Sequence, residues 1–187
     1  ARYRLSSVAG TGDAAATAMR RVALLIAMVC ATGCDDSFQG DEPPDQVEDA
    51  NFAGAYSINF NNDENGCAFD GWTVDATTTG VPVTITQDGN QVTADVEGLA
   101  GTFLDLYLGS KRLSGTVEGN DATLILLGAP RDHAGCVSVI DAEYALTLAG
   151  DAVSGTAVYT RAIQSGTCTF PAGCESHQTL SGSRAPQ

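Results

Sequence analysis

Apolar and polar residues alternate along most of the chain, from Phe52 onward. Between residues 81 and 86 every second side chain is apolar, and the same period returns between residues 92 and 96. A period of two is typical of β-strands that bury one face. The segment Asp88-Gly89-Asn90 separates the two runs and consists of residues that tolerate positive φ angles. These positions predict a β-hairpin.

Further runs of this kind cover residues 102–108, 113–118, 123–127, 137–148 and 153–163, separated by turns rich in glycine, asparagine and aspartate. In the run 137–148 the apolar phase changes after Val139, so we expect a bulge near Ile140 and Asp141. No segment from residue 34 onward shows a sustained helical stripe. Short connections favour neighbouring antiparallel strands. We therefore expect an all-β meander of eight or nine strands.

A short motif recurs in three of these strands, as Leu113-Ser114-Gly115-Thr116, Val153-Ser154-Gly155-Thr156 and Leu180-Ser181-Gly182-Ser183. Glycine within a strand packs no side chain and marks a bend, a bulge or the close approach of another element. Such positions suit the corners of a closed or strongly coiled sheet. Closure into an antiparallel meander barrel would also cover the sheet edges. A two-sheet β-sandwich is the alternative architecture.

The expected first strand contains Gly54-Ala55-Tyr56, which resembles the Gly-x-Trp opening of lipocalins, with Tyr in place of Trp. The layout is also similar to the small meander barrels of many bacterial lipoproteins. The resemblance covers three residues and the general order of strands. It implies a barrel domain over residues 52–187 that carries a small apolar molecule in its interior.

The N-terminal region has the layout of an export signal. Met19-Arg20-Arg21 supplies a basic start, and an apolar run over residues 22–29 follows. The segment Ala31-Thr32-Gly33-Cys34 resembles a bacterial lipobox, in which the signal is cut before a cysteine that carries diacylglycerol. The resemblance implies a signal peptide over residues 19–33 and lipid attachment at Cys34. Cleavage by the ordinary signal peptidase, which leaves Cys34 as a free thiol, is the alternative.

Two segments flank this signal. Residues 1–18 lack an initiating Met, and we interpret them as an extension upstream of the true start. Residues 34–51 contain seven acidic residues and a Pro-Pro pair, which predicts a disordered acidic tether. Asp35 resembles an inner-membrane retention signal of enteric bacteria, but other lineages sort differently, so the inner and outer membranes both stay open. We expect a lipid-anchored protein of the bacterial cell envelope, on its periplasmic or cell-surface face.

The charge from residue 34 onward is strongly negative, with 22 Asp and Glu against five Lys and Arg, a net of −17. Such a surface repels phosphate backbones and anionic lipid headgroups. We therefore expect no nucleic-acid partner, and we expect the lipid bilayer as a partner through acylated Cys34 alone. The remaining partner is an unidentified protein or small molecule.

Four cysteines remain beyond Cys34 in the expected mature chain. Cys67, Cys136, Cys168 and Cys174 are an even number in an exported protein, which predicts two disulfides. Three connectivities are possible. We favour Cys168 with Cys174, because the five residues between them include Pro and Gly and can close a short loop, and this leaves Cys67 with Cys136.

Catalytic patterns are scarce. His133 precedes Cys136 by three residues, as a base near a thiol nucleophile would, but a disulfide at Cys136 removes that chemistry. His177 has no nucleophile elbow near it, and no Cys-x-x-Cys pair is present. We therefore expect no catalytic residue, no metal and no cofactor.

Two further patterns have competing interpretations. The segment from Asn61 to Gly66 resembles the first half of a calcium loop, but position twelve is Trp72 instead of Glu, so we favour an ordinary polar turn. Five aromatic residues either line a ligand cavity or fill the barrel, and we favour core packing. They are Trp72, Phe103, Tyr107, Tyr144 and Tyr159.

Two functions follow from this pattern. The first is a membrane-anchored, non-catalytic binding or interaction module, and the second is a lipocalin-like carrier of a small apolar ligand. An interior cavity of several hundred cubic ångströms would favour the carrier, and a filled core would favour the module.

Overall fold

The computed structural model describes residues 48–186. The upstream segment 1–18, the expected signal peptide, Cys34 and the tether as far as residue 47 lie outside the described residues. In chain order the elements are β1 Gly54–Asn65, β2 Thr77–Asp88, β3 Gln91–Val96, α1 Gly98–Tyr107, β4 Arg112–Glu118, β5 Asp121–Leu126, β6 Arg131–His133, β7 Cys136–Ala149, β8 Ala152–Gly166 and β9 Cys174–Arg184.

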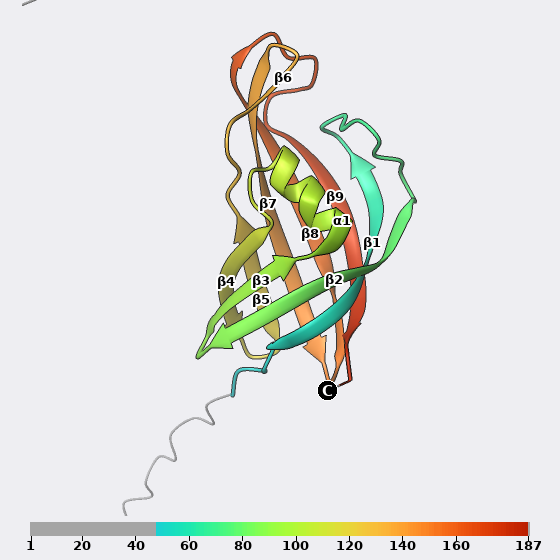
Figure 1. Ribbon diagram of the computed structural model, residues 1–187, viewed down its shortest axis with the longest axis vertical. Coiled ribbons are helices and arrows are strands. Elements are labelled where there is room, and N and C mark those ends of the chain that lie inside the picture. Colours follow the sequence, from blue (N-terminus) through green and yellow to red (C-terminus); the bar gives the residue numbers. More distant parts are fainter. Residues whose placement is uncertain (1–47, 187) are drawn as a thin grey trace, which may run out of the picture. The chain divides into compact units, whose positions relative to one another are not determined.

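Eight of the strands close into an antiparallel barrel (Figure 1). Strands β1 to β5 pair in sequence order, β5 pairs with β7, and β7, β8 and β9 continue the meander. Strand β9 then pairs with β1, which closes the sheet. The short β6 pairs only with the start of β7. The meander barrel expected from the sequence is confirmed, and the two-sheet sandwich is wrong.

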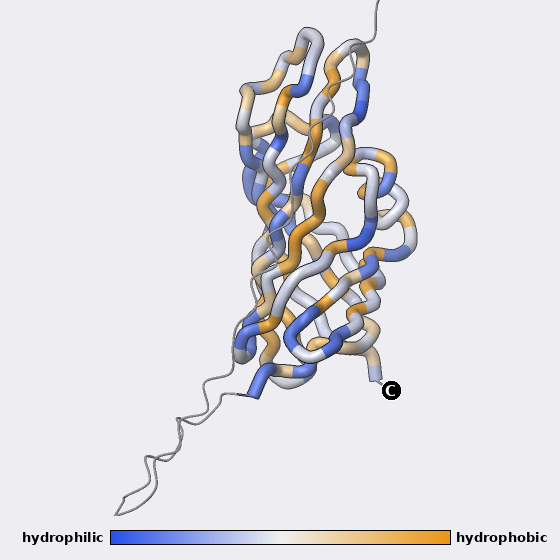
Figure 2. Tube along the Cα trace, turned by 90° about the vertical axis from the view of Figure 1, so that its left-hand side faces the viewer, coloured by the Kyte–Doolittle hydropathy of each residue, from blue (hydrophilic) through white to orange (hydrophobic). Residues whose placement is uncertain are grey.

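Hydrophobic and hydrophilic residues alternate along many of the strands (Figure 2). In β5, for example, Ala122, Leu124 and Leu126 are buried, and the residues between them are exposed. The side chains that point inward from the barrel strands form one continuous apolar core. Because a strand turns successive side chains to opposite faces, this pattern alone determines which face points inward.

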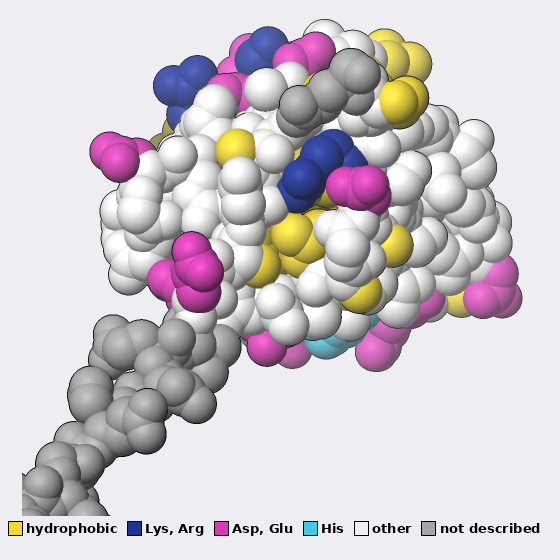
Figure 3. Space-filling model, turned by 90° about the horizontal axis from the view of Figure 1, so that it is seen from below, with side chains coloured by type: hydrophobic (Ala, Val, Ile, Leu, Met, Phe, Trp, Pro, Cys, Tyr) yellow, Lys and Arg dark blue, Asp and Glu magenta, His cyan; other side chains and the backbone are white. Residues whose placement is uncertain are grey.

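The end of the barrel where the described chain begins is closed. Phe52 is fully buried there, and the hydroxyl of Tyr56 donates a hydrogen bond of 2.9 Å to its carbonyl. Asp49, in the expected tether, already contacts the barrel, because its carboxylate accepts a 2.8 Å bond from the amide of Gly119. Figure 3 looks onto this end, where basic and acidic side chains lie next to hydrophobic ones.

The recurrent Ser-Gly motif marks places where strand backbones approach closely. A Cβ atom on Gly115 would overlap the backbone of Thr123, and one on Gly155 would overlap that of Ala145. Both glycines lie opposite residues of the adjacent strand, in β4 against β5 and in β8 against β7. Any side chain at these positions would push the paired strands apart.

The expected bulge near Ile140 and Asp141 is wrong. Side chains at even-numbered positions of β7 point inward from Cys136 through Leu148, so the phase does not change. Val137 and Val139 are half-buried on the other face of the strand. Because they are apolar, the sequence suggested that the inward-facing positions shift from odd to even numbers after Val139. The register shift of this strand pair lies between Val137 and Ser138 instead.

The expected strand at 102–108 is also wrong, because residues 98–107 form helix α1. Gly98 opens the helix with a φ of 64°, a conformation that favours glycine. At the other end, the amide of Leu108 donates to the carbonyl of Leu104 at 2.8 Å, and the amide of Ala129 donates to the carbonyl of Leu108. No helix among the described residues is long and apolar enough to cross a membrane.

Two disulfides staple the end of the barrel opposite Phe52. They join Cys67 to Cys174 and Cys136 to Cys168, so the pairing favoured from the sequence is wrong. Disulfides persist in oxidising compartments, which indicates an extracytoplasmic setting for this domain.

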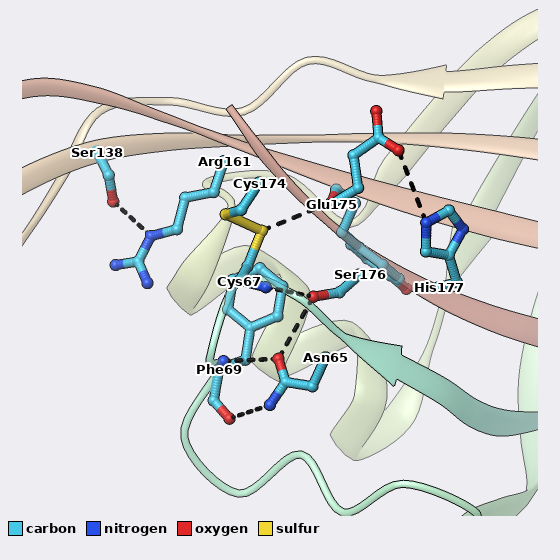
Figure 4. The surroundings of a disulfide bond; sticks show 10 residues. Asn65, Cys67, Phe69, Ser138, Arg161, Cys174, Glu175, Ser176 and His177 are labelled. Carbon is cyan, nitrogen blue, oxygen red and sulfur yellow. Dashed lines mark hydrogen bonds and ion pairs between the residues drawn. A yellow bond between two sulfur atoms is a disulfide. The ribbon is translucent and has the colours of Figure 1, made fainter. Parts of the chain in front are cut away.

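The strand register explains these partners. Asn65, the last residue of β1, pairs with Ser176 of β9, which brings Cys67, just after β1, to Cys174 at the start of β9 (Figure 4). In the same way, the first residue of β7 pairs with Gly166, the last residue of β8. Each disulfide therefore joins the ends of two adjacent strands, and the short loop between Cys168 and Cys174 is not closed by a disulfide.

Candidate functional site

A cavity of about 480 Å³ lies between helix α1 and the inner face of the barrel, toward the disulfide-bonded end. Most of its wall is apolar, from strands β1 to β3 and from the helix. Side chains of β7, β8 and β9 supply hydrogen-bonding groups on the far side. The lining residues are Phe60, Thr78, Thr79, Gly80, Val81, Pro82, Val96, Glu97, Leu99, Ala100, Phe103, Leu104, Tyr144, Tyr159 and Gln178.

Helix α1 covers this cavity and packs lightly on the barrel. Gly101 is its single buried residue, and a Cβ atom there would overlap the carbonyl of Val96 at the end of β3. Ala100 and Leu104 pack against the core, whereas Leu99 is 73% and Phe103 50% exposed although both line the cavity. One side of the site is therefore an element with little buried surface, of the kind that opens at low free-energy cost.

The opposite wall carries a series of linked side-chain hydrogen bonds across strands β7, β8, β9 and β1. The phenolic oxygens of Tyr144 and Tyr159 are 2.8 Å apart. The hydroxyl of Tyr159 also lies 2.9 Å from Oε1 of Gln178, and Nε2 of Gln178 donates to Oδ1 of Asn62 at 2.7 Å.

The available protons determine which group donates in each of these hydrogen bonds. Oε1 of Gln178 only accepts, so Tyr159 uses its single proton on that bond. Tyr144 must then donate to the Tyr159 oxygen. The oxygen of Tyr144 keeps its lone pairs, and no donor among the described residues reaches it. The cavity wall therefore presents a hydrogen-bond acceptor.

Burial keeps both phenols neutral. It raises the pKa of Tyr144 to about 12, an effect that the hydrogen bond with Tyr159 only partly offsets. Burial raises the pKa of Tyr159 well above its usual range, and the neighbouring Tyr144 raises it further. At neutral pH these side chains hold their protons, so they can bind polar groups but cannot serve as bases.

Below the tyrosines, apolar side chains pack the barrel interior. A second void there measures about 40 Å³, and side chains such as Ile58, Leu124 and Leu180 surround it. A ligand would thus occupy the space under α1 without reaching the closed end at Phe52.

The aromatic residues singled out in the sequence divide between cavity and packing. Phe103, Tyr144 and Tyr159 line the cavity. Trp72 packs behind it, with its ring centroid 5.7 Å from that of Tyr159. Tyr107 instead stacks on His133, at 5.5 Å between centroids. The expectation that these rings only fill the core is therefore incomplete.

The residues weighed for catalysis or metal binding do not converge. His133 lies on β6 against Tyr107, whereas His177 lies on β9, where Nε2 is 3.7 Å from the Glu175 carboxylate. Cys136 is in a disulfide. Within residues 48–186 no three His, Cys, Asp or Glu side chains are grouped as metal ligands.

The run from Asn61 to Asn65 belongs to strand β1, so the polar turn expected there is wrong. Nδ2 of Asn61 donates to the Asp63 carboxylate at 3.0 Å. Oδ1 of Asn65 accepts from the amide of Phe69 at 2.8 Å and from Ser176 at 3.3 Å (Figure 4). These side-chain oxygens therefore accept hydrogen bonds within β1, from β9 and from the turn that follows β1.

Sequence reasoning missed the residues that α1 and β9 contribute, namely Leu99, Ala100 and Gln178. The first two were missed because a strand was expected at residues 102–108 and no element was assigned to the residues just before it, where helix α1 begins. Gly98 and Gly101 were the available signal for an element other than a strand at this position. They lie three residues apart at the start of α1, and glycine does not suit the interior of a strand.

We compared the chain with known proteins at three levels. A scan against protein-family models, a search of curated proteins and a search of solved structures each returned no match.

Proposed function

We propose that this protein is an exported, non-catalytic binding protein whose barrel holds a small, largely apolar molecule beneath helix α1. The cavity of about 480 Å³ carries the proposal, because ligand sites typically enclose about 300–1,000 Å³ with mostly apolar walls and few polar groups. The ligand is bound and released unchanged, since the titratable groups that line the cavity are Glu97 and two phenols held neutral by burial.

The polar wall restricts the ligand further. The acceptor at Tyr144 is matched by one hydroxyl or N–H group on an otherwise apolar molecule. A ligand without such a donor would bury the Tyr144 oxygen against hydrocarbon, which costs about 1–3 kcal/mol.

Binding of N-phenyl-1-naphthylamine to the full-length protein tests the proposal. This neutral fluorescent probe is apolar and carries one N–H group, and we expect saturable binding with one probe per chain. Ala100→Phe places a ring in the cavity and should abolish binding. Leu106→Ser is the matched control, because Leu106 lies on the same helix, is 60% exposed and does not line the cavity.

Probe binding that survives Ala100→Phe in a folded protein would contradict the proposal. The protein would then act through its surface, as an interaction module for a partner protein. Mass spectrometry of the protein purified from its native host provides the complementary measurement, because a co-purified apolar molecule would identify the natural ligand.

We also propose that Cys34 anchors the protein to a bilayer. Support comes from the lipobox-like residues 31–34 and from the two disulfides, which are consistent with export. A fatty-acid probe supplied to the cells should label the wild-type protein and not Cys34→Ser. Equal labelling of that variant would exclude lipid attachment at Cys34.

A further inference from the structure

A second arrangement of polar and aromatic groups lies at the disulfide-bonded end, apart from the residues that line the cavity. Arg161 belongs to β8, two residues beyond Tyr159, where its neighbours in the adjacent strands are Ile140 and Cys174. Its guanidinium lies with its central carbon 3.6 Å from the centroid of the Phe170 ring. The Phe69 ring lies 5.7 Å from the same carbon.

This guanidinium is held in place. Nε donates a 3.0 Å bond to the hydroxyl of Ser138, a side chain that is 1% exposed (Figure 4). Phe170 belongs to a small second core, which both disulfides help to form. Stacking, hydrogen bonding and covalent bracing together fix the plane of the Arg161 fork.

The two terminal nitrogens of Arg161 have no partner among residues 48–186. Figure 4 shows them directed away from Ser138 with no interaction drawn. None of the ion pairs in the described part of the chain involves Arg161. Partial burial lowers the pKa of Arg161, and the nearby Asp70 opposes this effect without forming a contact ion pair. The structure thus keeps a cation partly out of water without pairing it.

We propose that Arg161 binds the carboxylate of a ligand through its two terminal nitrogens, with the half-buried Phe69 ring contacting the apolar group attached to that carboxylate and buried Phe170 supporting the guanidinium from below. A planar guanidinium matches a carboxylate in a bidentate pair. A monoanion suits this site better than a phosphate dianion, because Asp70 and the acidic surface repel the second charge. The carboxylate belongs either to a small organic acid or to the C-terminus of a peptide.

Titrations of the ¹⁵N-labelled full-length protein test this site, with the Arg161 Nε–H resonance as the readout. The ligands are benzoate, hexanoate, inorganic phosphate, and a Phe-ended tripeptide with a free or an amidated C-terminus. We expect saturable shifts with the carboxylates and weaker binding of phosphate. Binding of benzoate but not of the free-acid tripeptide identifies a small acid, and tighter binding of the free-acid than of the amidated tripeptide identifies a peptide terminus.

Substitutions of Arg161 then test whether benzoate binding depends on its guanidinium group. Arg161→Gln should weaken benzoate binding about tenfold to a hundredfold, as expected for the loss of charge-assisted bonds. Arg161→Lys keeps the charge but loses the fork, and should recover little of the affinity. Arg112→Gln is the matched control for charge, because Arg112 is on β4, is 67% exposed and pairs with Asp95. It should leave binding within about twofold of wild type.

Asp70→Asn keeps the proposal testable if Arg161 variants fail to fold. Removing this repulsive carboxylate should tighten benzoate binding. Unchanged resonances at about 20 mM benzoate, far above the range of useful affinities, would overturn the proposal. So would benzoate binding to folded Arg161→Gln with wild-type affinity, or a weaker affinity in Asp70→Asn.

Discussion

Tyr144 donates its phenolic proton to Tyr159 across the β7–β8 strand pair, at 2.8 Å between the oxygens. The direction is fixed because Tyr159 spends its own proton on Gln178. Two buried hydroxyls can satisfy each other's hydrogen bonds and leave no polar group facing the cavity. Here the series of hydrogen bonds ends at the Tyr144 oxygen, whose lone pairs have no donor among the described residues. One side of an otherwise apolar cavity therefore carries a hydrogen-bond acceptor.

Replacement of Tyr144 tests that polarity. Tyr144→Phe should lower the affinity for N-phenyl-1-naphthylamine by about fivefold to tenfold, the value of one neutral hydrogen bond. It should instead strengthen the binding of 1-phenylnaphthalene, which has the same rings and no N–H group, because no unpaired Tyr144 oxygen is then buried against the hydrocarbon. Fluorescence titration of both probes provides the measurement, and an equal loss for the two would show that Tyr144 acts by shape alone.

Alkaline pH should destabilise the fold through the same pair. The unfolded chain releases tyrosine protons near pH 10, whereas Tyr144 holds its proton to about pH 12 and Tyr159 well above its usual range. The unfolded state then binds fewer protons than the native state, so stability is full below about pH 10 and falls as pH rises toward 12. The slope should approach about 1.4 kcal/mol per pH unit for each phenol.

Urea unfolding at pH 8, 10 and 11 measures this slope. Tyr144→Phe lacks one of the two groups and should show about half of the decline. A stability that stays constant to pH 11 would contradict the burial of the two phenols.

The two disulfides should differ in their contribution. Cys67 and Cys174 enclose 107 residues, and Cys136 and Cys168 enclose 32. Chain entropy then gives about 5 kcal/mol for the first and about 4 kcal/mol for the second. The double serine variant of the first pair should therefore lose about 1 kcal/mol more than that of the second in urea unfolding. Thiol counting on denatured, unreduced protein should find all four cysteines oxidised.

Gly101→Ala should loosen helix α1 although alanine favours helices by about 1 kcal/mol over glycine. The added methyl group would overlap the carbonyl of Val96, so the helix must move off the end of β3. We expect faster hydrogen exchange at Leu104 and Leu108 and weaker binding of N-phenyl-1-naphthylamine. Leu106→Ala, on the exposed side, is the control, and slower exchange in Gly101→Ala would exclude the close contact.

Removing both histidines should leave ligand binding intact. His133 and His177 lie outside the lining of the cavity, so the double alanine variant should bind N-phenyl-1-naphthylamine with wild-type affinity. The cost in stability should stay below about 0.5 kcal/mol for each position. A hydrolase or transferase activity that falls by more than about a hundredfold in either variant would instead establish acid–base catalysis.

The barrel could be predicted because its strands carry their pattern locally. Residues 81–96 specify a hairpin by alternation and by Gly89, and the same pattern repeats around the sheet. Helix α1 could not be recognised this way. Leu104, Leu106 and Leu108 alternate as in a strand, whereas Phe103 and Tyr107 follow a helical spacing equally well. Contact with the end of β3 decides between the two, and that contact is tertiary.

The candidate site was even less accessible from sequence. Tyr144, Tyr159 and Gln178 come from three strands, and only the register places their polar atoms within bonding distance. The cysteine pairing failed for the same reason. Sequence distance favoured Cys168 with Cys174, but the β1–β9 register brings Cys67 to Cys174.

The position of β1 between β2 and β9 has a mechanical consequence. A pulling force on the N-terminal side of Asp49 would load β1 first and peel it from the closed end of the barrel. The peeling front meets a covalent bond at Cys67, which ties the far end of the strand to β9. Under tension β1 would therefore separate from its neighbours starting at the closed end near Phe52. Unfolding would halt at the Cys67–Cys174 bond, and the disulfide-bonded end of the barrel would unfold last.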